Sequence, residues 1–333
     1  MKNKFDLIVL GAGSGGLAAA RRAASFGMKV AVVEGDKVGG TCVVRGCVPK
    51  KLLVYASNYY NNLTVANDFG VKFNSVSVNV KVLLSNVRKE VNRLNDLYTQ
   101  TLNEAGIKLI KGWGSFLSAN SILISKSKNG EPITKIEGEN ILIAVGGRPL
   151  RPNIPGNALG WISDQMFSIN NYPKDIVIVG AGYIACEFSC ILDNLGINVT
   201  HLVRGKRLLK EFDSEISSQL EDSMRAKGIK LCFSETPIEI QGEEGQLEIF
   251  TNHKRTIKSG GLLWATGREP FTEGLGLEMA GIKLINNKLL VDQHQRTNVS
   301  NIYALGDVTN SYNLTPVAIE EGRIFSDNVF GSK

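Results

Sequence analysis

Two stretches of the chain share one pattern of apolar and polar positions. Each stretch begins with a short run of Val, Ile and Leu, followed by a glycine-rich turn and a helix-like stretch. Another glycine and a second apolar run complete the pattern. The first stretch covers residues 5–35 and the second covers residues 175–205. A βαβ unit with a glycine-rich first turn begins a dinucleotide-binding fold, so the sequence predicts such a unit twice.

Two similar segments indicate where one domain is inserted into another. Gly-Gly-Arg-Pro ends at residue 149, and a matching Gly-Arg-Glu-Pro ends at residue 270. We therefore expect an α/β protein with two Rossmann-like dinucleotide-binding domains. The first domain covers residues 1–148 and is completed by 269–333, and the second domain, 149–268, is inserted into it. A chain of 333 residues with 43% hydrophobic content can supply two cores of this size.

Composition excludes several classes of function. The longest apolar runs fall short of the roughly 18 residues of a bilayer span, and the N-terminus lacks the apolar core of a secretion signal. We therefore expect a soluble, cytoplasmic protein. The formal charge of +6 comes from cations interleaved with acids, without the basic stripe and aromatics of a nucleic-acid-binding surface. Anionic small ligands explain the excess charge equally well.

The first glycine-rich turn, GAGSGG, is a candidate pyrophosphate site. Gly11, Gly13 and Gly16 permit the tight turn and let backbone N–H groups and the helix N-terminus approach a pyrophosphate. Glu34, at the end of the second apolar run, can accept hydrogen bonds from a ribose. An ordinary glycine-rich turn is the alternative, because this motif alone is weak evidence. The strand before it, the helix after it and the acid together favour dinucleotide binding.

The second turn, GAGYIA, has the same design with one substitution. Gly180 and Gly182 are present, and Ala185 occupies the third glycine position. Arg204 stands where the ribose-binding acid is expected. An acid there would repel a 2′-phosphate and an arginine would bind it, so the residue favours NADPH over NADH. Lys210 is a candidate second contact; alternatively, both cations are ordinary surface residues.

The segment GGTCVVRGCVPKK is a candidate redox site. In a regular helix, residues five apart have Cα atoms roughly 8–9 Å apart, beyond the roughly 7 Å limit for a disulfide. A bridge between Cys42 and Cys47 therefore requires a distorted helix start, which Gly46 and Pro49 permit. Gly39 and Gly40 let the backbone approach a ligand closely. Two unrelated buried thiols are the alternative.

The remaining cysteines and the histidines form no catalytic cluster. An odd count of five cysteines without a secretion signal argues against a disulfide-stapled scaffold. Cys186 and Cys190 are four residues apart and could imitate half of a metal site, but no further ligand stands at a suitable spacing. We interpret them and Cys232 as buried core thiols. Three histidines receive no catalytic role: His201, His253 and His294.

Four motifs in order resemble the pyridine nucleotide–disulfide oxidoreductase family, and within it the glutathione reductases. They are GGTCxxxGCVPKK, GAGYIAxE, LLWATGRxP and TNVxNIYALGDV, and the likeness runs from Phe5 to the end. The resemblance implies that FAD and NADPH are the cofactors. A hydride then passes from NADPH to the flavin, and two electrons pass to a Cys42–Cys47 disulfide. In that scheme Cys47 lies against the flavin and Cys42 attacks the substrate disulfide.

The resemblance also implies roles for other residues. It pairs Lys50, near the flavin, with Glu187 on the NADPH side, and it places Tyr183 over the nicotinamide pocket. Asp307 follows a glycine at a strand end, where a carboxylate can bind a polyol or ribose, and it matches a family FAD contact with Thr41 and Thr315. The expected cofactor-binding residues are Gly11, Gly13, Ser14, Gly15, Gly16, Glu34, Thr41, Gly114, Gly180, Ala181, Gly182, Tyr183, Ile184, Arg204, Lys210, Gly267, Asp307 and Thr315.

The substrate implied by the resemblance is glutathione disulfide. Ser14, Arg21, Tyr98 and Arg323 match positions that contact glutathione in the family. Guanidinium groups bind carboxylates in bidentate fashion, so the two arginines suit the glutathione carboxylates. Alternatively, Arg21 belongs to a solvated helix face. No metal is expected, and the implied physiological role is glutathione metabolism and cell redox homeostasis.

One departure from the family pattern leaves the activity open. Full-length members continue into an interface domain, which forms the homodimer and supplies a His-Pro motif with an acid to the partner's active site. The sequence ends at Lys333 without this motif, so we expect a monomer. Reductive exchange needs a general acid, which the motif supplies. The alternatives are a reductase of another disulfide, similar to dihydrolipoamide dehydrogenase, and an FAD- and NADPH-binding module with diaphorase activity only.

Overall fold

The computed structural model describes residues 3–72, 77–309 and 312–331, and the chain divides into two compact units. The units change between residues 148 and 149 and again between 268 and 269, which are the two positions where the sequence suggests domain boundaries. The first unit comprises Met1–Cys47, Val91–Arg148 and Glu269–Lys333, and the second comprises Val48–Glu90 and Pro149–Arg268.

One segment lies in a different unit from the one expected. Residues 48–90, which we expect in the first domain, group with the second unit. The reason is packing, because Leu53 and Leu84 are fully buried in the same apolar cluster as Phe188. The apolar face of this segment thus completes the core of the second unit.

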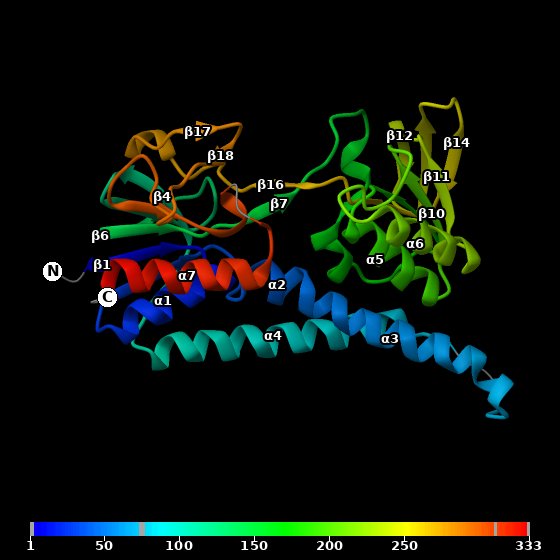
Figure 1. Cartoon of the computed structure of the whole chain (residues 1–333), viewed down its shortest axis with the longest axis horizontal. Coiled ribbons are helices and arrows are strands. Elements are labelled where there is room, and N and C mark those ends of the chain that lie inside the picture. Colours follow the sequence, from blue (N-terminus) through cyan, green and yellow to red (C-terminus); the bar gives the residue numbers. More distant parts are fainter. Residues whose placement is uncertain (1–2, 73–76, 310–311, 332–333) are drawn as a thin grey trace. The chain divides into compact units, whose positions relative to one another are not determined.

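A seven-stranded sheet forms the core of the first unit (Figure 1). Its order is β3-β2-β1-β6-β5-β4, and β19 also pairs with β6. β1, β2, β3, β6 and β19 are parallel, whereas β4 and β5 form an antiparallel meander with β6. The strands are β1 (Lys4–Leu10), β2 (Val30–Glu34), β3 (Lys108–Lys111), β4 (Trp113–Ser118), β5 (Ser121–Ser125), β6 (Pro132–Ile143) and β19 (Ile302–Ala304).

The apolar runs of the sequence become the parallel centre of this sheet. Leu7 to Leu10 in β1 are at most 2% exposed, as expected for a strand that is covered on both faces. In the β1–β2 ladder, Val9 lies opposite Val32. The carboxyl ends of these strands lie at one edge of the sheet, where ligands bind in open α/β folds.

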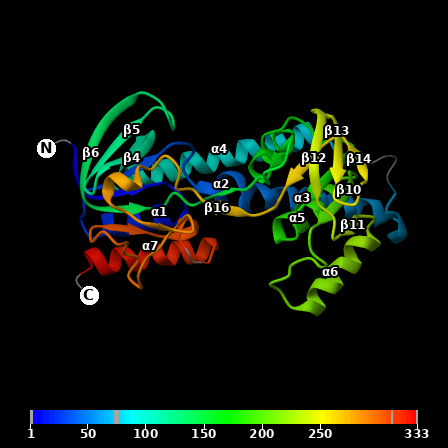
Figure 2. The same cartoon turned by 90° about the horizontal axis from the view of Figure 1, so that it is seen from above.

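Two helices of the first unit, α1 (Ser14–Ser25) and α7 (Thr315–Phe330), lie side by side (Figures 1 and 2). A Cβ on Gly322 of α7 would lie 2.4 Å from the Gly15 carbonyl oxygen of α1, so glycine permits this close approach. Arg22 Nε donates to Asp327 Oδ1 at 2.5 Å and joins the same helices by an ion pair.

The second unit contains a five-stranded parallel sheet of order β11-β10-β9-β15-β8 and a three-stranded antiparallel sheet. The parallel strands are β8 (Trp161–Ile162), β9 (Asp175–Val179), β10 (Asn198–Val203), β11 (Lys230–Phe233) and β15 (Leu262–Trp264). The antiparallel strands are β12 (Pro237–Glu243), β13 (Gln246–Thr251) and β14 (Thr256–Ser259).

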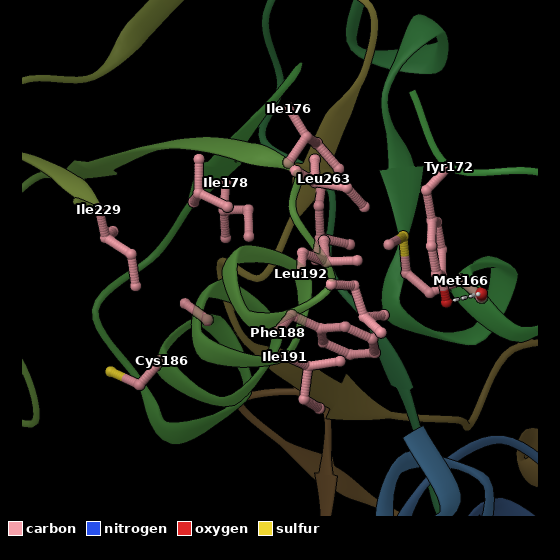
Figure 3. Close-up of a cluster of buried hydrophobic side chains, with 14 of the residues drawn as sticks. Met166, Tyr172, Ile176, Ile178, Cys186, Phe188, Ile191, Leu192, Ile229 and Leu263 are labelled. Atoms are coloured by element: carbon pink, nitrogen blue, oxygen red, sulfur yellow. Dashed lines mark hydrogen bonds between the residues drawn. The ribbon is translucent and has the colours of Figure 1, made fainter. Parts of the chain in front are cut away.

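The two predicted βαβ units are present as β1-α1-β2 and β9-α5-β10, where α5 is Tyr183–Asn194. Figure 3 shows Phe188, Ile191 and Leu192 of α5 beside Ile176 and Ile178 of β9. In the same view, the Tyr172 hydroxyl donates to the Met166 carbonyl at 2.9 Å, so the buried phenol is satisfied. The prediction of an α/β protein with two dinucleotide-type folds is confirmed.

The remaining elements are shorter or join these sheets. Two short strands, β7 (Gly147–Pro149) and β16 (Arg268–Pro270), pair with each other where the chain changes unit. The other helices are α2 (Gly40–Arg45), α3 (Cys47–Val65), α4 (Val80–Glu104) and α6 (Ser214–Ala226). The 3₁₀ helices are η1 (Ala66–Phe69), η2 (Asn157–Leu159), η3 (Ser163–Phe167), η4 (Leu277–Ala280) and η5 (Gly306–Val308), and β17 (Leu284–Ile285) pairs with β18 (Lys288–Leu289). Among the described residues, no helix has both the length and the apolar character of a membrane span.

Candidate functional site

The first glycine-rich turn connects β1 to α1 and brings together two glycine-rich segments. Gly11 has φ +101°, and a Cβ there would lie 2.5 Å from the Ala144 carbonyl oxygen, so only glycine fits. Gly13 caps the N-terminus of α1. A Cβ on Gly40 would lie 2.6 Å from the Gly13 Cα, which shows how closely the two backbones approach. The start of α1 therefore presents bare backbone beside the segment that leads to Cys42.

The carboxylate of Glu34 is held at the same turn. Its Oε2 accepts the Ala12 N–H at 2.7 Å, and its Oε1 accepts the Asp36 N–H at 2.8 Å. Burial raises the pKa of Glu34, and these two backbone N–H groups partly oppose that rise. Each carboxylate oxygen can accept a further hydrogen bond, so the side chain retains the capacity to bind a hydroxyl donor.

The two cysteines of the candidate redox site flank a break in the helix. α2 ends at Arg45, Gly46 has φ −143° and ψ −113°, and α3 begins at Cys47. This break provides the irregular backbone that a bridge between residues five apart requires. The two cysteines are not joined by a disulfide in the structure; Cys42 is half-buried and Cys47 is exposed.

A hydrogen bond joins the Cys42 and Cys47 side chains. This hydrogen bond, followed by burial, raises the pKa of Cys42 far above the usual thiol range, and a hydrogen bond with Thr315 partly opposes the rise. Thr315 Oγ1 also lies 4.0 Å from Cys47 Sγ. The contact therefore favours the protonated form of Cys42.

Several further expected FAD contacts lie in the first unit. Thr41 is in α2, Thr315 is the first residue of α7, and Asp307 is in η5. The η5 backbone is fixed by α7, because the Gly306 N–H donates to Glu321 Oε2 at 2.8 Å. Three further residues expected to contact FAD are packed against their neighbours. A Cβ on Gly114 of β4 would lie 2.9 Å from Leu10, and Gly15 and Gly16 are buried in α1.

Lys50 of α3 and Glu187 of α5 form an ion pair in the second unit. Lys50 Nζ lies 2.6 Å from Glu187 Oε1, and the two side chains are 24% and 38% exposed. Lys50 is three residues after Cys47, so the two positions are neighbours on the surface of α3. This is the pairing that the family resemblance implies; its catalytic role stays a prediction.

The second glycine-rich turn connects β9 to α5. Gly180 has φ +149°, and a Cβ there would lie 2.2 Å from the Ala265 carbonyl oxygen. By contrast, nothing lies within 4 Å of a Cβ placed on Gly182, the residue that caps α5. Ala185, in the third glycine position, is buried. Tyr183 is the first residue of α5, and its side chain is exposed.

His201 of β10 supports this turn, although the sequence analysis assigns it no role. The ring is fully buried, with Nε2 2.7 Å from the Gly180 carbonyl oxygen and Nδ1 3.1 Å from Ser189 Oγ. A carbonyl only accepts, so Nε2 carries the proton and Nδ1 accepts from the Ser189 hydroxyl. Burial lowers the pKa of His201 to about 4, which keeps the ring neutral. A histidine in the middle of a mostly buried strand is the only sequence signal of this contact.

The other NADPH-type candidates lie around the same turn. Ala181 is in the turn itself and Ile184 is in the first turn of α5. Arg204 directly follows β10 and its side chain is exposed, as is that of Lys210. Gly267, with φ +135°, precedes β16 and has open space where a Cβ would stand.

The four expected substrate residues all lie in the first unit. Ser14 and Arg21 are in α1, Tyr98 is in α4 and Arg323 is in α7. Arg21 and Arg323 are exposed, whereas Tyr98 packs partly against the apolar cluster beneath α1. Arg323 Nη1 lies 3.7 Å from Glu320 Oε2. Within the described residues, no hydrogen bond or ion pair joins the four positions to one another.

The other three cysteines differ in how deeply they are buried. Cys186 is buried, and burial raises its pKa to about 12. Cys190 and Cys232 are only half-buried, so the interpretation of all three as buried core thiols is wrong for these two. Cys232 Sγ accepts from Arg255 Nη2 at 3.3 Å, a polar contact that an apolar strand pattern does not reveal. The described residues include no group of His, Cys, Asp and Glu that could hold a metal ion.

The chain was compared with known proteins. A sequence model of the family described as pyridine nucleotide-disulphide oxidoreductase matches residues 5–322. A glutathione reductase of Nostoc sp. is 40% identical over 98% of the chain and 73% of its own length. One from Burkholderia cepacia is 40% identical over 100% of the chain and 73% of its own length. The chloroplastic/mitochondrial glutathione reductase of Pisum sativum is 39% identical over 98% of the chain and 60% of its own length. The chain belongs to the pyridine nucleotide-disulphide oxidoreductase family.

Proposed function

We propose that the chain is an NADPH-dependent, FAD-containing disulfide reductase that acts on glutathione disulfide through Cys42 and Cys47. The observation that carries the proposal is the contact of these two side chains across the helix break at Gly46. Family membership supports the reaction class, and the names of the three relatives support glutathione disulfide as the substrate. A monomeric state and a cytoplasmic location stay predictions.

The first unit fits a flavin dinucleotide. Gly13 and Gly40 present bare backbone at the N-terminus of α1, where N–H groups can bind a pyrophosphate. Glu34 is fixed at the same turn by the Ala12 N–H and can accept a ribose hydroxyl. Asp307 and Thr315 would hold further polar atoms of the group. Bound FAD would supply the chemistry of accepting a hydride and passing two electrons to a disulfide.

The second unit fits NADPH. The open space at Gly182 and the N-terminus of α5 suit a pyrophosphate, and Gly180 provides the tight turn before them. Arg204 and Lys210 offer positive charge where a ribose 2′-phosphate would lie, at the end of β10. The exposed ring of Tyr183 stands at the start of the same helix. These residues favour NADPH because NADH has no 2′-phosphate to interact with Arg204.

The two thiols have different roles in the thiol–disulfide exchange. After reduction, the Cys42 sulfur attacks one sulfur of glutathione disulfide, and its proton passes through water to the departing glutathione thiolate. A mixed disulfide forms, and the first glutathione leaves as a thiolate that takes up a proton. Cys47 then attacks Cys42 Sγ, which releases the second glutathione and restores the Cys42–Cys47 bond. The hydrogen bond between the two side chains favours the protonated form of Cys42 before substrate arrives.

The charged residues position the reactants. Lys50 places an ammonium group one helical turn after Cys47, where it favours negative charge on that sulfur. Glu187 fixes the ammonium group at 2.6 Å. Arg21 and Arg323 are exposed on α1 and α7 and suit the carboxylates of glutathione. Ser14 and Tyr98 add hydroxyl groups that can donate to the same substrate.

The test is steady-state turnover by the FAD-loaded protein with two nucleotides and three acceptors. NADPH should support reduction of glutathione disulfide better than NADH does, and lipoamide should be a poor acceptor. In Cys42→Ser, disulfide turnover should vanish while reduction of a dye persists. Cys186→Ser is the matched control, because this buried thiol should not affect either reaction. Dye reduction without any disulfide turnover in the unmodified chain would contradict the proposal and support the diaphorase alternative.

A further inference from the structure

The loop that follows β10 gathers positive charge at the proposed NADPH site. Residues 204–210 include Arg204, Lys206, Arg207 and Lys210, and the side chains of Arg204, Lys206 and Lys210 are exposed. In the described part of the chain, the side chains of Arg204 and Lys206 make no hydrogen bond or ion pair. Arginine and lysine lose much rotamer freedom on binding, so such a loop binds an anion best when its backbone is already fixed.

One face of α6 contacts the backbone of this loop. The Leu208 N–H donates to Glu221 Oε1 at 2.7 Å. The single proton of the Ser217 hydroxyl is shared between the Leu209 carbonyl at 3.4 Å and the Asp213 carbonyl, one turn back in its own helix, at 3.0 Å. Ser217 and Glu221 are four residues apart, so both side chains project from the same face of α6.

The loop is also held from its other side. The Leu209 N–H donates to the Ala181 carbonyl at 2.8 Å, which ties the loop to the second glycine-rich turn. The Leu208 side chain is fully buried in the apolar cluster of the second unit. Leu209 has φ +46°, a left-handed conformation that a leucine keeps only when its surroundings hold it. The backbone at residues 208–209 is therefore fixed by contacts, while Arg204, Lys206 and Lys210 around it are exposed.

We infer that Glu221 is a positioning residue for NADPH preference: its carboxylate fixes the backbone of residues 204–210 so that Arg204 and Lys210 meet the 2′-phosphate. The inference rests on the NADPH site proposed above and deepens it. Glu221 cannot bind the phosphate itself, because both groups are anionic. Its effect should therefore appear only with ligands that carry a 2′-phosphate.

The test compares two substitutions that remove the same charge. Glu221→Gln keeps an oxygen that can accept the Leu208 N–H, whereas Glu221→Ala does not. Binding of adenosine 2′,5′-bisphosphate and of adenosine 5′-monophosphate is measured by calorimetry on each variant of the full chain. Relative to Glu221→Gln, Glu221→Ala should bind the 2′-phosphorylated probe about five- to tenfold more weakly, the value of one lost hydrogen bond. Its affinity for the monophosphate should be unchanged.

Two other outcomes would overturn the inference. Equal affinities of the two variants for the 2′-phosphorylated probe would show that the hydrogen bond positions nothing, even though the NADPH site itself stands. If the unmodified chain shows no preference for that probe, the NADPH site and the inference fail together. Should Glu221→Ala not fold, Ser217→Ala removes the second contact from the same helix face. It should weaken binding of the 2′-phosphorylated probe selectively, and unchanged binding would count against the inference.

Discussion

His201 and Gly180 are joined by a 2.7 Å hydrogen bond from the imidazole Nε2 to the carbonyl oxygen of the glycine-rich turn. The ring has no exposed surface, and Ser189 satisfies its other nitrogen. A neutral ring is required for this arrangement, because a protonated Nδ1 could no longer accept from the Ser189 hydroxyl. The geometry of the proposed NADPH turn therefore depends on the charge state of a residue that makes no contact with solvent.

This relationship predicts a pH dependence of stability. The pKa of His201 falls from 6.5 in the unfolded chain to about 4 in the folded one because of burial. The unfolded state thus binds a proton that the folded state does not between pH 6.5 and 4. The contribution of neutral His201 to the free energy of unfolding is fully present above pH 6.5. It should decline by about 3 kcal/mol as the pH falls to 4.

The measurement is the free energy of unfolding of the unmodified chain and of His201→Gln across this pH range. Glutamine does not titrate, and its amide can donate to the Gly180 carbonyl. The stability difference between the two proteins should therefore shrink, or reverse, as the pH falls. Parallel curves would show that His201 does not have a lowered pKa in the folded state.

The two glycines of the second turn should respond differently to alanine. In Gly180→Ala, the added Cβ would lie 2.2 Å from the Ala265 carbonyl oxygen, and φ +149° is unfavourable for alanine. We expect a loss of roughly 2–4 kcal/mol in unfolding free energy. Gly182→Ala meets open space, so it should fold normally but bind NADPH more weakly. Thermal unfolding and nucleotide titration separate the two effects, and equal stability of both variants would contradict the described packing.

Neighbouring arginines of α1 should also separate stability from substrate binding. Arg22 pairs with Asp327, and its side chain is 40% exposed, so Arg22→Ala should cost at most about 1 kcal/mol. Arg21 is exposed, and Arg21→Ala should raise the KM for glutathione disulfide without a loss of stability. Steady-state kinetics and chemical denaturation on both variants give the comparison. A KM effect in Arg22→Ala alone would exclude Arg21 as the substrate contact.

The Lys50–Glu187 ion pair should matter more for turnover than for stability. Both side chains are partly exposed, so either substitution should change the unfolding free energy by about 1 kcal/mol or less. We expect Lys50→Met and Glu187→Gln to lower kcat by roughly tenfold or more, a loss of about 1.4 kcal/mol of transition-state stabilisation. If the double variant is no slower than either single one, the two residues act as a unit. Unchanged kcat in Lys50→Met would remove this residue from the proposed mechanism.

The sequence predicts the repeated βαβ units because their signals are local. An apolar run, a glycine turn and a helix lie within about thirty residues of one another. Positions 11 and 180 require glycine because the backbone there has a positive φ. The helix break at Gly46 is predictable for the same reason, because the spacing of two cysteines limits their geometry.

The contacts that local patterns do not encode are those made by packing distant segments. The grouping of residues 48–90 with the second unit depends on such packing, because Leu53 lies in one apolar cluster with residues more than a hundred positions later in the chain. The roles of His201 and Glu221 depend on which face of a strand or helix meets a turn, and periodicity does not identify the partner of that face. The polar surroundings of Cys232 likewise come from Arg255, which lies in the turn between β13 and β14 of the other sheet.

The central claim, that Cys42 and Cys47 form a redox pair driven by NADPH, is tested most directly by differential alkylation. The FAD-loaded protein is first oxidised with glutathione disulfide, then incubated with or without NADPH, alkylated and mapped by mass spectrometry. Cys42 and Cys47 should be protected without NADPH and alkylated after its addition, while the buried Cys186 remains unlabelled in both samples. Labelling of Cys42 and Cys47 that does not change with NADPH would contradict the account.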